Sequence, residues 1–334
     1  MKLVVLSPNW LGDAVMALPA LADVRRQFGS AQITVAARSS VATLYTMVPG
    51  VDAVLPLPGR GGLDGLRSWR QDVAALASGG FDVALLFPNS WASAFVARQA
   101  GIRERWGLAT DLRARLLTRS AAKPRNVSHQ AGYYQALVAA LGIENGPAYA
   151  RVEVPAGAVN PVAARPYIVL APGAAYGAAK QWPPERFAEL ATLLCRAGQP
   201  VVLVGSRADA DTCAAIVGAT EAASRPGIVD LSGRTTLAEL TAVLAGAAAV
   251  VSNDSGAMHL AGAVGAPVVA IFGATDERRT APLVNGPGAP PPRVLATNVW
   301  CRPCMLRECP IDHRCMTGIG ASAVAAAVTS AQRS

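Results

Sequence analysis

Short apolar runs rich in β-branched residues alternate with Ala- and Leu-rich stretches along most of the chain. Four of these runs in the first half are predicted to be strands: Lys2–Ser7, Gln32–Ala36, Ala53–Leu57 and Asp82–Phe87. Strands that alternate with helical stretches favour parallel βαβ units. The pattern therefore predicts an α/β fold.

A second series of the same kind begins near Pro166. Its predicted strands are Tyr167–Ala171, Pro200–Gly205, Ile228–Asp230, Ala249–Ser252 and Pro267–Phe272. The stretch 146–166 between the two series is rich in Pro, Gly and Ala and is predicted to be a linker. We expect two Rossmann-like domains, residues 1–155 and 156–318, facing each other across a cleft. Residues 319–334 should end in a helix that packs back on the first domain.

Ligands of open α/β sheets bind outside the carboxyl ends of the strands, so the loops that follow strands are the places to search. The first such loop holds Asn9, Gly12 and Asp13. Gly12 permits a tight turn, and Asp13 stands at the predicted start of a helix. Asp13 is then either a helix N-cap or a carboxylate that deprotonates an acceptor hydroxyl. The loop lacks the GxGxxG pattern of dinucleotide-binding sites.

The loop after the strand ending at Ala171 is built from small residues and contains Ala175, Tyr176 and Lys180. Small residues let a chain pass close to a ligand, and Lys180 brings a positive charge to it. The alternative is a flexible loop with a solvated lysine.

A third strand leads into Ser252-Asn253-Asp254-Ser255-Gly256 and then into a helix that carries His259. Asp254 or Ser255 can cap that helix, which would leave N–H groups and the positive dipole end for phosphate oxygens. His259 is either an ordinary helix histidine or a contact to a donor phosphate, and we favour the contact. This loop predicts a diphosphate-binding site.

Length and charge add a partner to this picture. The chain has 334 residues and a formal charge of +8, and most of that excess lies in residues 1–155. The segment 98–125 is strongly basic. It is either a solvated helix face or a surface for an anionic partner such as a phosphorylated glycolipid, a membrane or nucleic acid. Its cations are not interleaved with aromatic residues, which disfavours single-stranded nucleic acid.

The N-terminus has no signal-peptide pattern, and the apolar runs are too short to span a membrane. We therefore expect a cytoplasmic protein. Of its six cysteines, Cys195 and Cys213 lie in apolar helical stretches and are expected to be buried. The other four, in a cytosolic chain, form either a structural zinc or iron–sulfur site or a set of reduced thiols or a local disulfide. These four are Cys301, Cys304, Cys309 and Cys315.

Taken together, these motifs resemble those of a known family, the ADP-heptose:lipopolysaccharide heptosyltransferases of glycosyltransferase family 9, and most of all its type II members. The resemblance extends over almost the whole chain. Its marks are Asn9–Asp13, Pro172–Gly177 with Lys180–Pro183, Leu231–Thr235, Ser252–Gly256 with His259, Phe272–Asp276, and the Cys-rich tail with Pro310–His313.

The resemblance implies a GT-B fold and an inverting transfer of L-glycero-D-manno-heptose. The donor would be ADP-heptose, and the acceptor would be the first heptose on the Kdo2–lipid A core. No divalent metal or other cofactor is expected to take part in catalysis. The enzyme would meet its lipid acceptor at the inner face of the cytoplasmic membrane, and no nucleic acid is expected as a partner.

The resemblance also implies roles for individual residues. Asp13 matches the general base, and Lys180 matches a catalytic diphosphate contact. The expected donor-binding set is Gly12, Ala175, Tyr176, Lys180, Leu231, Ser232, Gly233, Asn253, Asp254, Ser255, Gly256 and His259, with Leu231–Gly233 near the adenine. The candidate acceptor-binding set is Asn9, Arg113, Arg115, Arg119 and Lys123. Type I members place a ribose-binding Glu after the strand ending at Gly205. This chain has Ser206-Arg207-Ala208-Asp209 there, so the ribose contact is unassigned and Asp209 is a candidate.

Two other functions remain open at this point. One is a different nucleotide-sugar enzyme of the same architecture, such as a type I heptosyltransferase, an epimerase or a transferase with another donor. The other is a non-catalytic protein that binds nucleotides or nucleic acid through its basic first half.

Overall fold

The computed structural model describes residues 1–58, 65–125, 127–163 and 165–333. The chain divides into two compact units, Met1–Tyr149 and Ala150–Ser334, and each is described by itself. Position 164, in the predicted linker, lies outside the described residues. The boundary comes a few residues earlier than predicted, because the backbone N–H groups of Ala150 and Val152 already donate to Val284 and Ala263 of the second unit.

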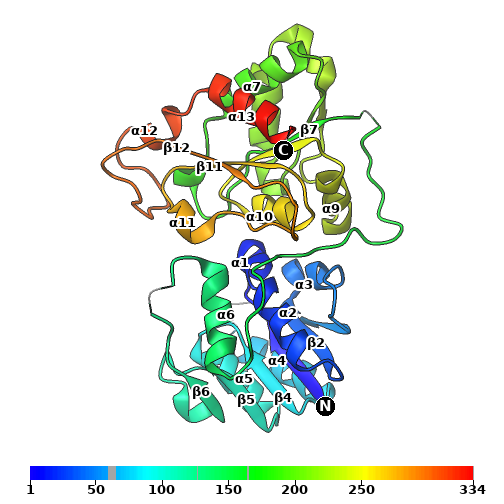
Figure 1. The fold of residues 1–334 in the computed structure, drawn as a ribbon, viewed down its shortest axis with the longest axis vertical. Helices are drawn as coiled ribbons and strands as arrows, with labels where there is room; N and C mark the ends of the chain where they lie inside the picture. The colour runs from blue at the N-terminus through cyan, green and yellow to red at the C-terminus, as the bar shows by residue number, and fades with distance from the viewer. Residues whose placement is uncertain (59–64, 126, 164, 334) are drawn as a thin grey trace. The chain divides into compact units, whose positions relative to one another are not determined.

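The first unit alternates strands and helices as the apolar pattern predicts (Figure 1). Its strands are β1 (Lys2–Leu6), β2 (Gln32–Arg38), β3 (Ala53–Leu57), β4 (Val83–Leu86), β5 (Glu104–Leu108) and β6 (Arg119–Ala121). Its helices are α1 (Leu11–Met16), α2 (Leu18–Gln27), α3 (Ser39–Tyr45), α4 (Gly65–Ser78), α5 (Trp91–Gln99) and α6 (Gln130–Ala140), with a 3₁₀ turn at Ala114–Leu116.

The second unit repeats this plan. Its strands are β7 (Ile168–Ala171), β8 (Val201–Leu203), β9 (Ile228–Asp230), β10 (Ala249–Asn253), β11 (Val268–Phe272) and β12 (Arg293–Ala296). Its α-helices are α7 (Pro184–Arg196), α8 (Ala210–Ala219), α9 (Leu237–Ala245), α10 (Gly256–Ala263), α11 (Glu277–Thr280), α12 (Arg314–Thr317) and α13 (Ala321–Ala331). Its 3₁₀ turns are Ala178–Lys180, Arg207–Asp209 and Ala222–Gly227.

Both sheets are parallel and have the same strand order. It runs β3-β2-β1-β4-β5-β6 in the first unit and, read from the corresponding edge, β9-β8-β7-β10-β11-β12 in the second. Counted from its own first strand, each sheet is in the order 3-2-1-4-5-6 of the Rossmann fold. The order reverses between β1 and β4 and between β7 and β10, and ligands bind at such switch points. The predicted α/β architecture is confirmed.

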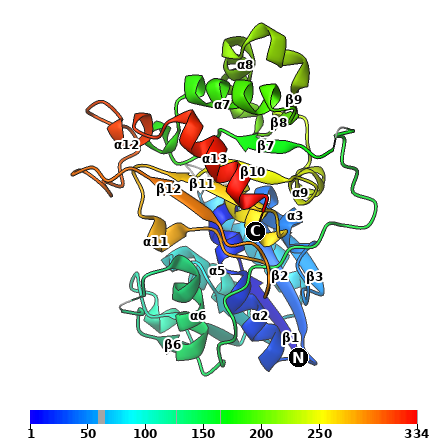
Figure 2. The same ribbon diagram turned by 45° about the horizontal axis from the view of Figure 1, so that its top comes forward.

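The central strands are buried on both faces, as expected of a parallel sheet with helices on each side. β7, β10 and β11 are buried along their whole length. Alternate residues of these strands, such as Leu170, Val251 and Ile271, pack in one core with α7, α8 and α13. The helices α9 and α10 lie on the other side of the sheet (Figures 1 and 2).

The last helix, α13, was expected to pack on the first domain, and that expectation is wrong. Its apolar residues Ala321, Val324, Val328 and Ala331 are buried in the core of the second unit. Figure 2 shows the helix lying along the sheet of that unit beside α7. Its apolar side packs on the sheet of the second unit, which the same half of the chain forms. The helix α13 is therefore part of the second unit.

Three strands were not predicted from the sequence: β5, β6 and β12. Each lies at or next to the edge of its sheet and is partly exposed, so its sequence lacks a long apolar run. The Pro- and Gly-rich stretch between α11 and β12 is irregular. No helix in the described part of the chain combines the length and the apolar character needed to cross a bilayer.

Candidate active site

Two loops of the second unit meet at the switch point between β7 and β10. The loop after β7 ends in the 3₁₀ turn Ala178–Lys180, and the loop after β10 leads through Asp254 into α10. Because Ala171 and Ser252 are paired in the two neighbouring strands, the loops leave the sheet side by side. This topology explains how residues more than seventy positions apart come together.

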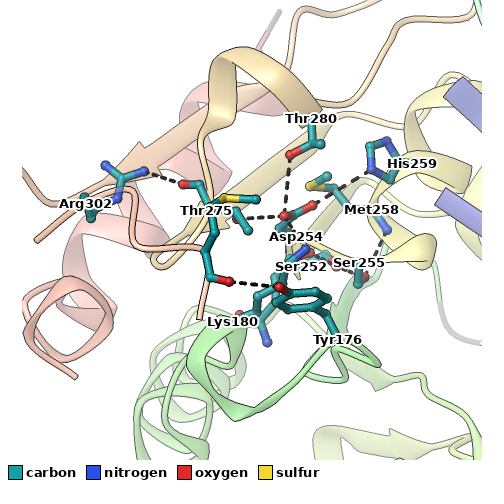
Figure 3. Close-up of polar contacts among 12 residues, drawn as sticks. Tyr176, Lys180, Ser252, Asp254, Ser255, Met258, His259, Thr275, Thr280 and Arg302 are labelled. Atoms are coloured by element: carbon teal, nitrogen blue, oxygen red, sulfur yellow. Dashed lines mark hydrogen bonds and ion pairs between the residues drawn. The ribbon is translucent and has the colours of Figure 1, made fainter. Parts of the chain in front are cut away.

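Lys180 and Asp254 form a buried ion pair at this point (Figure 3). Nζ of Lys180 lies 2.7 Å from Oδ2 of Asp254, and their side chains are 14% and 4% exposed. The hydroxyl of Thr275 also donates to Oδ2 at 2.7 Å, and Nε2 of His259 lies 4.0 Å from Oδ1. A carboxylate at this depth requires such compensation. The Asp254 carboxylate therefore holds Lys180 in place, instead of presenting its own negative charge to a ligand.

His259 stands on α10 and is buried, with a side chain that is 4% exposed. Its ring faces Asp254 (Figure 3). The direct contact of His259 to a donor phosphate stays a prediction. His259 belongs to the group of polar residues around the Asp254 carboxylate.

The helix α10 begins with Ser255 as its N-cap, one of the two residues proposed for that role. Oγ of Ser255 accepts a hydrogen bond from the N–H of Met258 at 3.4 Å and lies 3.0 Å from Oγ of Ser252. Lys180 pairs with Asp254, the residue directly before this N-cap. The positive end of the helix dipole therefore lies next to the Lys180 ammonium. Gly256 is the first helical residue, and a glycine without a side chain suits the close approach of an anion.

Asn253 differs from its predicted role. Its side chain is completely buried: Oδ1 accepts from the N–H of Trp182 at 3.0 Å, and Nδ2 donates to the carbonyl of Pro172 at 2.7 Å. Both partners lie in the loop after β7. Asn253 therefore fastens the two loops together, and its amide does not face a ligand.

Ala175 and Tyr176 lie exposed on the loop after β7, as a ligand contact requires. The Tyr176 ring lies 5.0 Å from Nζ of Lys180, a cation–π distance. Its hydroxyl donates to the carbonyl of Met305 at 2.8 Å. Lys180 is therefore bounded by a carboxylate on one side and an aromatic ring on the other.

The predicted adenine loop, Leu231–Gly233, follows β9. Gly233 has a φ of +66° and passes the backbone of Arg207, where a Cβ would come within 3.0 Å. Ser232 is buried, and its N–H donates to Oδ1 of Asp230 at 2.9 Å. Asp209, the candidate ribose contact, caps its own turn, because its Oδ2 accepts from both the N–H and the hydroxyl of Ser206 at 2.7 Å.

In the first unit, α1 begins at Leu11, two residues earlier than predicted, and its N-cap is Trp10. Asp13 is thus a residue of the first helical turn and not the cap. It is partly exposed, while Asn9 and Trp10 beside it are exposed. Burial, together with the charge of Asp13, raises the pKa of Tyr134. A carboxylate that is accessible at the carboxyl end of a central strand suits a general base.

Arg113 was predicted to bind the acceptor, and the structure corrects this. It is completely buried, and its guanidinium donates to the carbonyls of Leu108, Pro88 and Ser90. Burial lowers its pKa to about 10. Arg113 ties strand-end loops together, whereas Arg115, Arg119 and Lys123 are exposed. The basic segment is also not a helix face, since it contains β5 and β6.

Cys301, Cys304, Cys309 and Cys315 line one small cavity together with Ala179 and Ala274, and all carry free thiols. Burial raises the pKa of Cys315. Within the residues that the structure describes, no group of three or more His, Cys, Asp or Glu side chains is arranged to hold a metal ion. Of the other two cysteines, Cys213 is buried as expected and Cys195 is only partly buried.

Sequence reasoning missed Thr275 as a site residue. It stands inside the Phe272–Asp276 motif of the resemblance, which could have directed attention to it. Its role is visible only when the end of β11 is seen next to the end of β10, since these strands are neighbours in the sheet.

Comparison with known proteins identifies the family of this chain. The model of glycosyltransferase family 9 (heptosyltransferase) matches residues 69–314. Lipopolysaccharide heptosyltransferase 2 of Salmonella typhimurium is 31% identical over 299 residues, covering 85% of this chain and 86% of that protein. The Escherichia coli protein of the same name is 32% identical over 303 residues, with the same coverage.

Solved structures agree. The structure of E. coli ADP-heptose lps heptosyltransferase II is 26% identical in sequence and superimposes with a TM-score of 0.85, covering 100% of this chain and 99% of that one. This match confirms the GT-B fold, and the family match sets aside an epimerase or a non-catalytic binding protein. The chain belongs to glycosyltransferase family 9, the heptosyltransferase family, and is a glycosyltransferase.

Proposed function

We propose that this enzyme transfers L-glycero-D-manno-heptose from ADP-heptose to the first heptose of the Kdo2–lipid A core. The observation that carries the proposal is the Lys180 ammonium held beside the N-terminus of α10. A fixed cation and a helix dipole at one point suit a leaving group whose charge collects on a diphosphate. The type II relatives are the reason for choosing this acceptor.

In the proposed reaction, Asp13 takes the proton of the acceptor hydroxyl. The hydroxyl oxygen then forms a bond to the anomeric carbon while the bond from that carbon to the diphosphate breaks, which inverts the configuration. Lys180 and the α10 dipole stabilise the departing ADP. Asp254 holds Lys180 in position through the ion pair. Thr275 and His259 in turn hold the Asp254 carboxylate in position.

The acceptor is proposed to meet exposed cations of the first unit. Arg115, Arg119 and Lys123 are exposed on one short segment, and they suit the phosphates and carboxylates of a lipid-linked core. Leu112, beside them, is 96% exposed. We propose that this segment also brings the enzyme to the cytoplasmic face of the membrane.

A transfer assay with ADP-heptose and acceptors that carry zero, one or two heptoses tests the proposal. We expect product only with the acceptor that carries one heptose. Transfer to the heptose-free acceptor would indicate a type I activity instead. Transfer from UDP- or GDP-sugars, with none from ADP-heptose, would overturn the donor assignment.

A further inference from the structure

The cysteine-rich segment, residues 301–315, is hydrogen-bonded to the loop that follows β11. The contacts come from the guanidinium of Arg302, whose side chain is 11% exposed. Its Nε donates to the carbonyl of Gly273 at 2.6 Å, and Nη2 donates to the carbonyl of Thr275 at 3.1 Å and to Oε2 of Glu277 at 2.6 Å. Three bonds of different direction fix the course of this loop.

The loop fixed by Arg302 in turn reaches the ion pair of the active site. Thr275, whose carbonyl accepts from Arg302, donates its hydroxyl to Asp254 at 2.7 Å, and Asp254 binds Lys180 at 2.7 Å. Figure 3 shows Thr275 between Arg302 and Asp254, with Lys180 below Asp254. Each link joins buried or nearly buried groups, so a shift at one end has little room to be absorbed.

The same segment also grips the loop that carries Lys180. The N–H of Ala179 donates to the carbonyl of Arg307 at 2.9 Å, and Nε2 of His313 lies 3.0 Å from the carbonyl of Ala179. Gly177 passes so close to Arg307 that a Cβ would lie 2.3 Å from its carbonyl oxygen. One segment therefore sets the position of both members of the Lys180–Asp254 pair.

We propose that Arg302 is a positioning residue of the donor site: it acts through Thr275 and Asp254 to place the Lys180 ammonium against the donor diphosphate. The assignment of the diphosphate rests on the proposed function. The planar fork of arginine suits this task, because it can donate in three fixed directions at once, whereas the ammonium of a lysine cannot copy that geometry.

A first test needs no ligand. The chain contains three lysines, Lys2, Lys123 and Lys180, and the first two are exposed. Acetic anhydride labelling followed by mass spectrometry should find Lys180 labelled much more slowly than the other two. In Arg302→Ala, Lys180 should react several-fold faster while Lys2 and Lys123 keep their rates. Arg314→Ala is the matched control, since Arg314 pairs with Asp312 at the surface of the same segment.

A second test measures binding of ADP and of adenosine by calorimetry. Arg302→Ala should weaken ADP binding roughly tenfold, the scale of one lost charge-assisted hydrogen bond, and leave adenosine binding unchanged. Arg302→Lys should behave like Arg302→Ala. In a Lys180→Met background, Arg302→Ala should cause no further loss for ADP, because its effect passes through Lys180.

Equal losses for ADP and adenosine, or losses that add to those of Lys180→Met, would assign Arg302 a general structural role and overturn the proposal. If Arg302→Ala does not fold, Thr275→Val breaks the same line at its next link and must then give the same selective loss. A wild-type protein that neither binds ADP nor transfers heptose would contradict the proposed function. Unchanged Lys180 labelling in Arg302→Ala would contradict this inference alone.

Discussion

Asp13 is the residue on which the proposed chemistry depends most directly. A general base contributes about 100- to 10,000-fold to the rate of proton transfer steps. Asp13→Asn keeps the shape of the side chain and removes its basicity, so kcat should fall by at least about 100-fold. The dissociation constant for ADP should stay the same, and calorimetry checks this. Near-normal turnover in the variant would show that another group takes the proton.

Lys180 and Asp254 form one ion pair, but their substitution should affect ADP binding and stability differently. Lys180→Met should weaken ADP binding roughly tenfold or more and should also lower the free energy of unfolding, because Asp254 is left as an uncompensated buried charge. The double variant Lys180→Met/Asp254→Asn should recover stability and not affinity.

Thermal melting and calorimetry on the single and double variants check these two effects. Lys180→Arg, which keeps the charge, is the control for the cation. Recovery of ADP affinity in the double variant would show that Lys180 makes no contact with the nucleotide.

Arg113 should matter for folding and not for the acceptor. Its side chain satisfies several buried carbonyls, so Arg113→Ala should lower the free energy of unfolding by about 3 kcal/mol. Arg115→Ala, two positions away and exposed, should leave stability within about 0.5 kcal/mol. Chemical denaturation compares the two, and equal stability of both variants would contradict the structural role of Arg113.

At the scale of elements, α13 belongs to the core of the second unit. Val328 is completely buried there, so Val328→Ala should cost about 2 kcal/mol of unfolding free energy. The neighbouring Thr329 is exposed, and Thr329→Ala is the matched control. Fluorescence-monitored denaturation checks the difference. A neutral Val328→Ala would mean that α13 is only loosely attached.

The elements also show what the sequence could and could not predict. Buried parallel strands carry continuous apolar runs, and all nine predicted strands are present near the expected positions. The polar, partly exposed strands β5 and β6 carry no such run, and they were taken for a basic surface segment. The start of α1 was misplaced because Trp10 caps it without a side-chain hydrogen bond, so no residue type marks the position.

For the site, the loops at the strand ends could be predicted, because the topology alone selects them. The contacts of the individual side chains could not be predicted. Asn253 and Asp254 are adjacent in the sequence and both polar, yet one fastens two loops and the other holds a lysine. That difference depends on which strand lies next to which, and the same holds for Arg302, which acts on a loop that ends more than twenty residues before it.

At the scale of the molecule, the exposed cations Arg115, Arg119 and Lys123 should govern membrane association. Replacing all three with Ala should reduce binding to vesicles that contain anionic lipid, and binding of the wild type should fall as salt is raised. Co-sedimentation with vesicles checks both.

A variant with Arg70, Arg151 and Arg333 replaced by Ala has the same change in net charge from exposed but scattered positions. It should bind vesicles like the wild type. Binding that ignores salt and lipid charge would remove these cations from any role at the membrane.

The buried pairing of Lys180 with Asp254 also bears on how the enzyme finishes a catalytic cycle. A lysine without a counter-ion would attract free ADP, the product, as strongly as it attracts the donor. Here the ammonium is already neutralised by a carboxylate that the fold holds in place, so a diphosphate must share it. In the proposed reaction, this competition should lower the affinity for the product and so favour its release. The ammonium that Asp254 holds should also lose little conformational entropy when the next donor binds.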